Sequence, residues 1–207
     1  MKITFLGGGN MAIALVGGLI QRGFNAQDLA VIEILPDARE RLSAQFRIRV
    51  FGEASAEALA CDVLVLAVKP QQMREALTGW PAGGKRPLIV SIAAGLLVND
   101  LARWMDGYRR IVRAMPNTPA LIGAGMTGLY ADPSVSAEDR KNAETILAAV
   151  GETIWVDSES LIDSITAISG SGPAYVFYFL EAMQQAAVDL GLTAEQGYAL
   201  ALATFTG

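Results

Sequence analysis

The stretch KITFLGGGNMA, residues Lys2–Ala12, decides the fold class. An apolar strand candidate, Lys2–Leu6, runs into three glycines, and apolar residues then recur at helical spacing over Met11–Arg22. The glycines and the alanine fit the pattern G-x-G-x-x-A, in which small residues permit a tight turn and let a pyrophosphate approach a helix N-terminus. A plain strand-to-helix turn could use the same residues, but the position between a strand and a helix favours dinucleotide binding.

An acidic residue, Glu33, ends the second predicted strand (Leu29–Ile34), 24 residues after Gly9. A carboxylate at this position normally accepts hydrogen bonds from the adenosine ribose, which favours NAD. Arg39 and Arg41 are near enough in sequence to bind a 2′-phosphate instead, and Glu33 could also be a solvated strand end. The residues alone therefore leave the choice between NADP and NAD open.

Strand and helix patterns alternate up to Asp157, which predicts a Rossmann-type, doubly wound and mostly parallel α/β sheet. Beyond it the pattern is helical, with a turn at SGSGP between two helices. We therefore expect a dinucleotide-binding domain over residues 1–157 and an all-helical region over residues 158–207. The further strands are predicted at Ile48–Phe51, Val63–Val68, Leu88–Ile92, Arg109–Ala114, Met126–Ala131 and Glu152–Val156, and the further helices at Pro36–Phe46, Ser136–Val150, Leu161–Ile168, Ala174–Leu190 and Ala194–Phe205.

The composition excludes several kinds of chemistry. The 207 residues include no histidine and one cysteine, Cys61, so neither a Ser-His-Asp triad nor a Cys/His zinc site can form, and we expect no metal. Sixteen Lys and Arg against 21 Asp and Glu give a net charge of −5, which disfavours nucleic-acid binding. The uncharged stretch Ile3–Gln21 is interrupted by glycines, unlike a membrane span. We expect a cytoplasmic protein without a membrane partner.

Three further motifs follow or precede predicted strands. Ala67–Pro70 (AVKP) ends the fourth strand, where Lys69 and Pro70 would border the ribose and phosphates, because ligands bind beyond the carboxyl ends of parallel strands. The small residues of Ser91–Gly95 (SIAAG) suit close approach of a nicotinamide ring, although tight packing explains them equally well. Gly79–Lys85 has the spacing of a P-loop, but an arginine replaces the required Ser or Thr and a strand follows, so we reject that interpretation.

Two motifs in the second half could bind ligands. In Arg113–Ala120 (RAMPNTPA), two prolines stiffen the loop, and Asn117 offers a donor and an acceptor to the cofactor, unless it only caps a turn. SGSGP combines backbone N–H groups with two hydroxyls and could cradle a carboxylate, unless it is simply a helix-capping turn. The candidate substrate contacts there are Ser169, Ser171 and Gly172.

Taken together, GGGNMA, AVKP, SIAAG, RAMPNTPA and SGSGPAY stand in the order found in pyrroline-5-carboxylate reductases, and the resemblance covers essentially all 207 residues. It implies a Rossmann-type NAD(P)H domain, a helical dimerisation domain that forms a homodimer or higher homo-oligomer, and reduction of the cyclic imine 1-pyrroline-5-carboxylate to L-proline in proline biosynthesis. We expect NADP as the cofactor, with NAD as the alternative. The cofactor contacts implied by position are Leu6, Gly7, Gly8, Gly9, Asn10, Met11, Val68, Lys69 and Ala94.

The resemblance also implies that Glu159, in DSESLID, contacts the substrate amine, where it would act catalytically by favouring the iminium. Hydride would pass from the reduced nicotinamide to the imine carbon, and an imine that arrives protonated needs no histidine acid. Ile34 stands where family members often carry a small polar residue, so the resemblance leaves recognition of the 2′-phosphate of NADP open. The family continues into further helices and a Gly-Gly-Thr-Thr loop, so we expect this chain to be a fragment.

Two alternatives compete with this interpretation. A related NAD(P)-dependent dehydrogenase or imine reductase would usually carry a lysine acid/base on a helix of its second domain. The only lysine after Lys85 is Lys141, which precedes the helical region and counts against this class. A non-catalytic dinucleotide-binding module would keep GGGNMA but would not need SGSGP.

Overall fold

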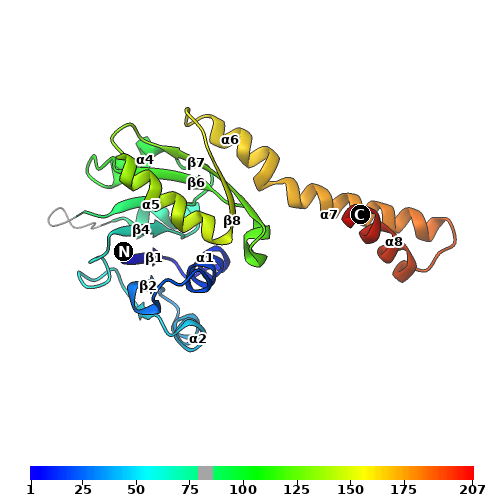
Figure 1. Cartoon of the computed structure of the whole chain (residues 1–207), viewed down its shortest axis with the longest axis horizontal. Coiled ribbons are helices and arrows are strands. Elements are labelled where there is room, and N and C mark those ends of the chain that lie inside the picture. Colours follow the sequence, from blue (N-terminus) through cyan, green and yellow to red (C-terminus); the bar gives the residue numbers. More distant parts are fainter. Residues whose placement is uncertain (79–85) are drawn as a thin grey trace.

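The computed structural model describes residues 1–78 and 86–207, so the P-loop-like segment Gly79–Lys85 lies outside the described residues. The first three quarters of the chain form an α/β body (Figure 1). A long helix, α7 (Gly172–Asp189), extends away from this body, and α8 (Ala194–Thr206) folds back along it.

Within the described residues, one sheet has the strand order β3-β2-β1-β4-β5-β6-β7-β8. All neighbouring strands pair in parallel except β6 and β7, which are antiparallel. Strands β1, β2, β4 and β5 are buried along their whole length, as expected for parallel strands covered on both faces. The strands are β1 Ile3–Leu6, β2 Leu29–Ile32, β3 Arg49–Phe51, β4 Val63–Leu66, β5 Leu88–Ser91, β6 Ile111–Met115, β7 Gly125–Ala131 and β8 Gly151–Trp155.

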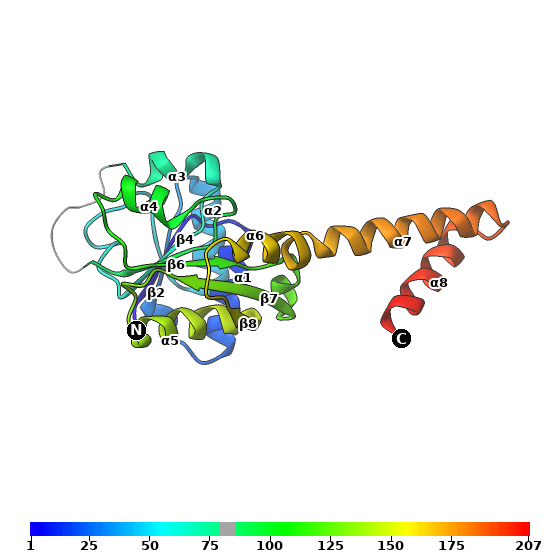
Figure 2. The same cartoon turned by 90° about the horizontal axis from the view of Figure 1, so that it is seen from above.

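Helices cover both faces of this sheet, which confirms the predicted Rossmann-type, doubly wound class. One apolar cluster packs α1 and α5 against the sheet, and a second packs α3 and α4 against the other face (Figure 2). The short helices α3 and α4 were not predicted from the sequence. The helices of the body are α1 Asn10–Gln21, α2 Pro36–Phe46, α3 Pro70–Ala76, α4 Val98–Trp104 and α5 Ala137–Leu147, with 3-10 turns at Ala26–Asp28, Thr118–Ile122 and Ala148–Val150.

The predicted turn at SGSGP is wrong, because the chain stays helical there. Helix α6 (Leu161–Ile165) passes into a π-helical turn, Thr166–Gly170, in which the Ser171 N–H donates to the Thr166 carbonyl over 2.8 Å. Pro173 explains the widened turn, since proline has no N–H and its ring crowds the carbonyl four residues earlier. The chain therefore enters α7 without a loop.

Helices α7 and α8 form a hairpin and pack against each other. Gly191, at φ +95°, lies in the connection, and Thr193 and Gln196 form a reciprocal capping box at the start of α8. Large apolar side chains remain exposed on both helices, including Phe177, which is 62% exposed. In the described part of the chain, no helix is both long and apolar enough to cross a membrane.

A bidentate ion pair fastens α5 to the start of β6. Asp139 accepts hydrogen bonds from Nε and Nη2 of Arg110 at 2.7 and 2.6 Å. These bonds hold the pKa of the Asp139 carboxyl below its usual range. The pair therefore stabilises the fold fully above a pH of about 4, the ordinary pKa of Asp, and this contribution is lost as the pH falls through the lower pKa of the folded state.

We predict that Asp139→Asn lowers the free energy of unfolding by roughly 1–3 kcal/mol at neutral pH, because Arg110 loses its charged acceptor. Denaturant titrations at several pH values measure this, and the difference from wild type should shrink below a pH of about 4. Glu138→Gln, an exposed neighbour in the same helical turn, serves as the control. A constant difference down to low pH would contradict the assignment.

Candidate functional site

The first glycine of the loop between β1 and α1 is required by the fold. Gly7 has φ +105°, a conformation that side chains disfavour, and a Cβ atom there would lie 2.9 Å from the carbonyl carbon and oxygen of Ala67. Its N–H also donates to the Ile32 carbonyl over 2.9 Å. Gly7 therefore allows β1 to end between the ends of β2 and β4.

The third glycine is different, because the protein itself leaves room for a side chain. No heavy atom lies within 4 Å of a Cβ placed on Gly9, which is exposed and has an ordinary φ of −73°. Gly9 is the N-cap of α1 and makes no side-chain cap, so the N–H groups of Asn10 and Met11 have no acceptor among the described residues. Open space beside unpaired N–H groups fits a phosphate held at a helix N-terminus.

Charged groups meet at the end of β2, next to the glycine loop. The Glu33 carboxylate accepts hydrogen bonds from the Gly8 N–H at 3.0 Å and from the Leu35 N–H at 2.9 Å. Nη1 of Arg39 donates to the carbonyls of Glu33 and Ile34 at 3.1 and 2.8 Å. The structure thus places an anion and a guanidinium together where the adenosine ribose of a dinucleotide would lie.

The predicted cofactor contacts share one edge of the sheet. In the register of the parallel strands, Leu6 pairs with Leu66 and Leu66 with Ser91, so the segments after β1, β4 and β5 start side by side. Lys69 is exposed at the start of α3, and the small residue Ala94 is exposed after β5. The sites predicted along this edge are Leu6, Gly7, Gly8, Gly9, Asn10, Met11, Val68, Lys69, Pro70 and Ala94.

The side chain of Asn117 joins two parts of the protein. Its Nδ2 donates to the carbonyl and to the hydroxyl oxygen of Ser169 at 3.2 and 3.3 Å, and its Oδ1 accepts from the Met126 N–H at 2.9 Å. The structure therefore brings Asn117 to the predicted substrate motif, and its amide is engaged by protein groups.

Glu159 lies just before α6 and is held from two sides. Its Oε1 accepts from Nη1 of Arg113 at 2.9 Å and from the Val98 N–H, the first of α4, at 2.6 Å. Arg113 is only 3% exposed and Glu159 22%. The second carboxylate oxygen makes no hydrogen bond within the described ranges. Arg113 was not predicted as a site residue, although a charged residue inside the otherwise apolar strand β6 is a signal of a buried ion pair.

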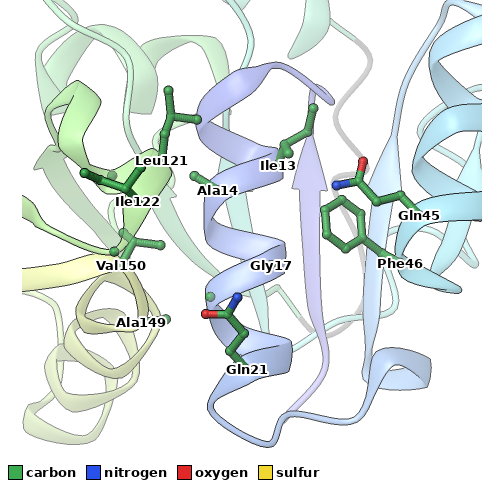
Figure 3. A pocket seen from close by; sticks show the side chains of 13 residues that line it. Ile13, Ala14, Gly17, Gln21, Gln45, Phe46, Leu121, Ile122, Ala149 and Val150 are labelled. Atoms are coloured by element: carbon green, nitrogen blue, oxygen red, sulfur yellow. The ribbon is translucent and has the colours of Figure 1, made fainter.

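A groove of about 330 Å³ lies along the flank of α1, away from these residues (Figure 3). Ile13 and Gly17 of α1, Phe46 of α2, Ile122 and Val150 line it. None of the predicted site residues contributes to it, so we do not assign this groove to the dinucleotide.

A glycine loop of this geometry, at the carboxyl edge of a doubly wound sheet, is typical of dinucleotide-binding proteins of the Rossmann class. Family models agree: one described as NADP oxidoreductase coenzyme F420-dependent matches residues 2–95, and one described as pyrroline-5-carboxylate reductase dimerisation matches residues 159–207. The second match assigns the helical region to a homo-oligomer.

Individual proteins extend the comparison to the whole chain. Pyrroline-5-carboxylate reductase of Pseudomonas aeruginosa is 45% identical over 208 residues, which cover 100% of this chain and 76% of that protein. The structure of the Coxiella burnetii reductase has a TM-score of 0.90 at 41% identity, covering 100% of this chain and 77% of that one. The structure of the Plasmodium falciparum reductase with NADP bound has a TM-score of 0.85 at 30% identity, covering 100% of this chain and 76% of that one. The chain belongs to the pyrroline-5-carboxylate reductase family.

Substitutions at Gly7 and Gly9 form a matched pair that tests folding and ligand binding separately. We predict that Gly9→Ala keeps the melting temperature within a few degrees of wild type and weakens dinucleotide binding roughly tenfold or more, because the methyl group occupies the open space beside the helix N-terminus. Gly7→Ala should instead destabilise the fold by roughly 1–3 kcal/mol through backbone strain. Fluorescence titration with NADPH and thermal melts measure both effects, and unaltered NADPH affinity in Gly9→Ala would refute the assignment.

Removing the carboxylate of Glu159 should destabilise the protein, because it leaves the buried guanidinium of Arg113 without a counter-ion. We predict a loss of about 3 kcal/mol for Glu159→Ala, and less for Glu159→Gln, whose amide oxygen can still accept both hydrogen bonds. Chemical denaturation gives the values, with Asp163→Asn on the exposed side of α6 as the control. Equal stability of Glu159→Ala and wild type would show that the Arg113–Glu159 ion pair contributes nothing to the free energy of unfolding.

Proposed function

We propose that this chain reduces 1-pyrroline-5-carboxylate to L-proline with NADPH as the hydride donor. The observation that carries this proposal is 45% identity over the full chain to a pyrroline-5-carboxylate reductase, together with a glycine loop whose open side fits a dinucleotide. The bound nicotinamide supplies the hydride. The protein's part is to bind and orient the two reactants and to exclude water between them.

The cofactor contacts follow from the carboxyl edge of the sheet. We propose that the N–H groups from Gly9 to Met11 bind the pyrophosphate with Gly7 and Gly8 beside it, and that Val68, Lys69 and Pro70 border the ribose and phosphates. Ala94 would leave room for the nicotinamide ring because its side chain is one methyl group. Leu6 and Asn117 would contribute backbone atoms only, because the side-chain amide of Asn117 is already bonded to Ser169 and to the Met126 N–H.

We infer NADP rather than NAD from the P. falciparum relative crystallised with NADP and from the position of Arg39. Its guanidinium stands at the end of β2, where a 2′-phosphate would need a cation. Glu33 is already satisfied by the N–H groups of Gly8 and Leu35, so it need not accept from a ribose diol. NAD stays the alternative, since a carboxylate this close would also repel a phosphate.

The substrate would lie between this edge and the helical segment that follows Glu159. We propose that Ser169, Ser171 and Gly172 bind its carboxylate, and that the free oxygen of Glu159 faces the imine nitrogen and favours its protonated form. With no histidine in the chain, the proton would arrive with the substrate.

Assembly and location complete the proposal. We infer a homodimer or a larger homo-oligomer formed through α7 and α8, supported by the exposed aromatic side chains of these helices and the dimerisation match. The boundary between residues 157 and 158 stays a proposal as well: α6 still packs on β6 and β7, and the chain leaves the α/β body with α7. The cytoplasmic location stays a prediction of the sequence.

The direct test is loss of absorbance of the reduced nicotinamide when 1-pyrroline-5-carboxylate is added, with NADPH and NADH in parallel. We expect oxidation that depends on the imine and is faster with NADPH at low cofactor concentration. If the Arg39 guanidinium binds the 2′-phosphate, Arg39→Ala should reduce the difference between the oxidation rates with NADPH and with NADH. Cofactor binding without oxidation by any imine would instead favour a non-catalytic dinucleotide-binding module.

A further inference from the structure

Alternate residues of β6 and its extension contact the helical segment that precedes α7. Arg113 bonds Glu159, a Cβ atom on Gly170 would lie 2.8 Å from Cε of Met115, and Asn117 bonds Ser169. The intervening residues Val112 and Ala114 belong to the apolar cluster on the opposite face. This period of two is that of an extended strand, and Asn117 continues it with φ −121° and ψ 168°.

The polarity of the Asn117 amide is fixed by its partners. Oδ1 must accept, because the group facing it is the Met126 N–H, and Nδ2 must donate, because it faces the carbonyl of Ser169. Both ends of the amide are therefore used, and its orientation cannot reverse without losing both bonds.

The Ser169 carbonyl needs a donor from outside its helix. In an α-helix it would accept from the N–H four residues later, but that residue is Pro173, which has none. The π-helical turn accommodates the proline ring, and Nδ2 of Asn117 replaces the absent donor at 3.2 Å.

The second hydrogen bond of Nδ2 makes the Ser169 hydroxyl oxygen an acceptor and leaves its hydrogen free to donate. Because this oxygen accepts from Nδ2 at 3.3 Å, its own hydrogen points elsewhere, and it donates to no acceptor in the described parts of the chain. Ser169 is half-buried, so the hydroxyl remains reachable. A half-buried hydroxyl with its donor free suits an anion.

We propose that Asn117 is a positioning residue that fixes the π-helical turn and presents the Ser169 hydroxyl as a donor to the carboxylate of the substrate. This inference rests on the proposed function and deepens it. It assigns the side chain of Asn117 to recognition of the substrate's carboxylate through Ser169.

A pair of imines tests this assignment, since 1-pyrroline is 1-pyrroline-5-carboxylate without the carboxylate. In Asn117→Ala, kcat/KM for 1-pyrroline-5-carboxylate should fall roughly tenfold or more, as for a lost hydrogen bond to a charged group. The value for 1-pyrroline and the affinity for NADPH should change less than about twofold. A purely structural defect would reduce kcat/KM for both imines alike.

A double-mutant cycle with Ser169→Ala adds a second readout. If Asn117 acts through Ser169, the double variant should lose no more than the worse single variant, and independent roles would multiply the losses. Asn117→Asp keeps the size and the acceptor for the Met126 N–H but turns an oxygen toward the Ser169 carbonyl, so it should lose the same selectivity. Asn142→Asp on α5, whose side chain makes no hydrogen bond in the described residues, is the matched control.

The outcomes separate the two proposals. Oxidation of NADPH by neither imine with the wild-type protein would overturn the proposed function and this inference with it. If the wild-type protein is active, any one of three results would overturn the role of Asn117 alone. These are equal losses of kcat/KM for both imines, multiplied losses in the double variant, and weaker NADPH binding by Asn117→Ala. If Asn117→Ala does not fold, Asn117→Asp and Ser169→Ala carry the same comparison.

Discussion

Strand β6 has opposite chemistry on its two faces, and the position of the helical region depends on that difference. Val112 and Ala114 lie in the apolar cluster with α1 and α5, whereas Arg113 and Met115 contact the segment from Glu159 to Gly170. A buried guanidinium costs free energy unless a carboxylate compensates it, and Glu159 is the carboxylate that does so. Because Glu159 also accepts the first N–H of α4, one side chain ties the helical region to both β6 and the loop after β5.

The sheet edge itself rests on a second constraint, the close approach of β1, β2 and β4. Gly7 lies where a side chain would strike the backbone of Ala67, so its glycine serves packing, whereas the space at Gly9 has no protein atom to fill it. The same motif thus contains one residue set by the fold and one that we propose is set by a ligand. This distinction explains why G-x-G-x-x-A predicts both a strand–turn–helix and a phosphate site.

Local pattern was enough to predict the class of the fold and most of its strands, because buried parallel strands are continuous apolar runs bounded by turn residues. It did not predict α3 and α4, which have seven residues each and too few turns for a periodic signal. It also misjudged SGSGP, whose glycines and proline favour a turn locally while packing against Met115 and Asn117 keeps the chain helical. The pairing of Arg113 with Glu159 joins residues far apart in sequence, and a single sequence carries no signal of such contacts.

The ion pair also limits how much Glu159 can contribute electrostatically. A carboxylate that faced the substrate alone would attract an iminium strongly in a site shielded from water, but Arg113, bonded to Oε1 at 2.9 Å, cancels much of that field. In the role proposed for Glu159, the favourable effect at the substrate would be confined to the free oxygen, at short range, where hydrogen-bond geometry matters more than net charge. We therefore propose that Glu159 acts on the substrate chiefly as a fixed acceptor, whose placement comes from the same two bonds that hold the helical region against the sheet.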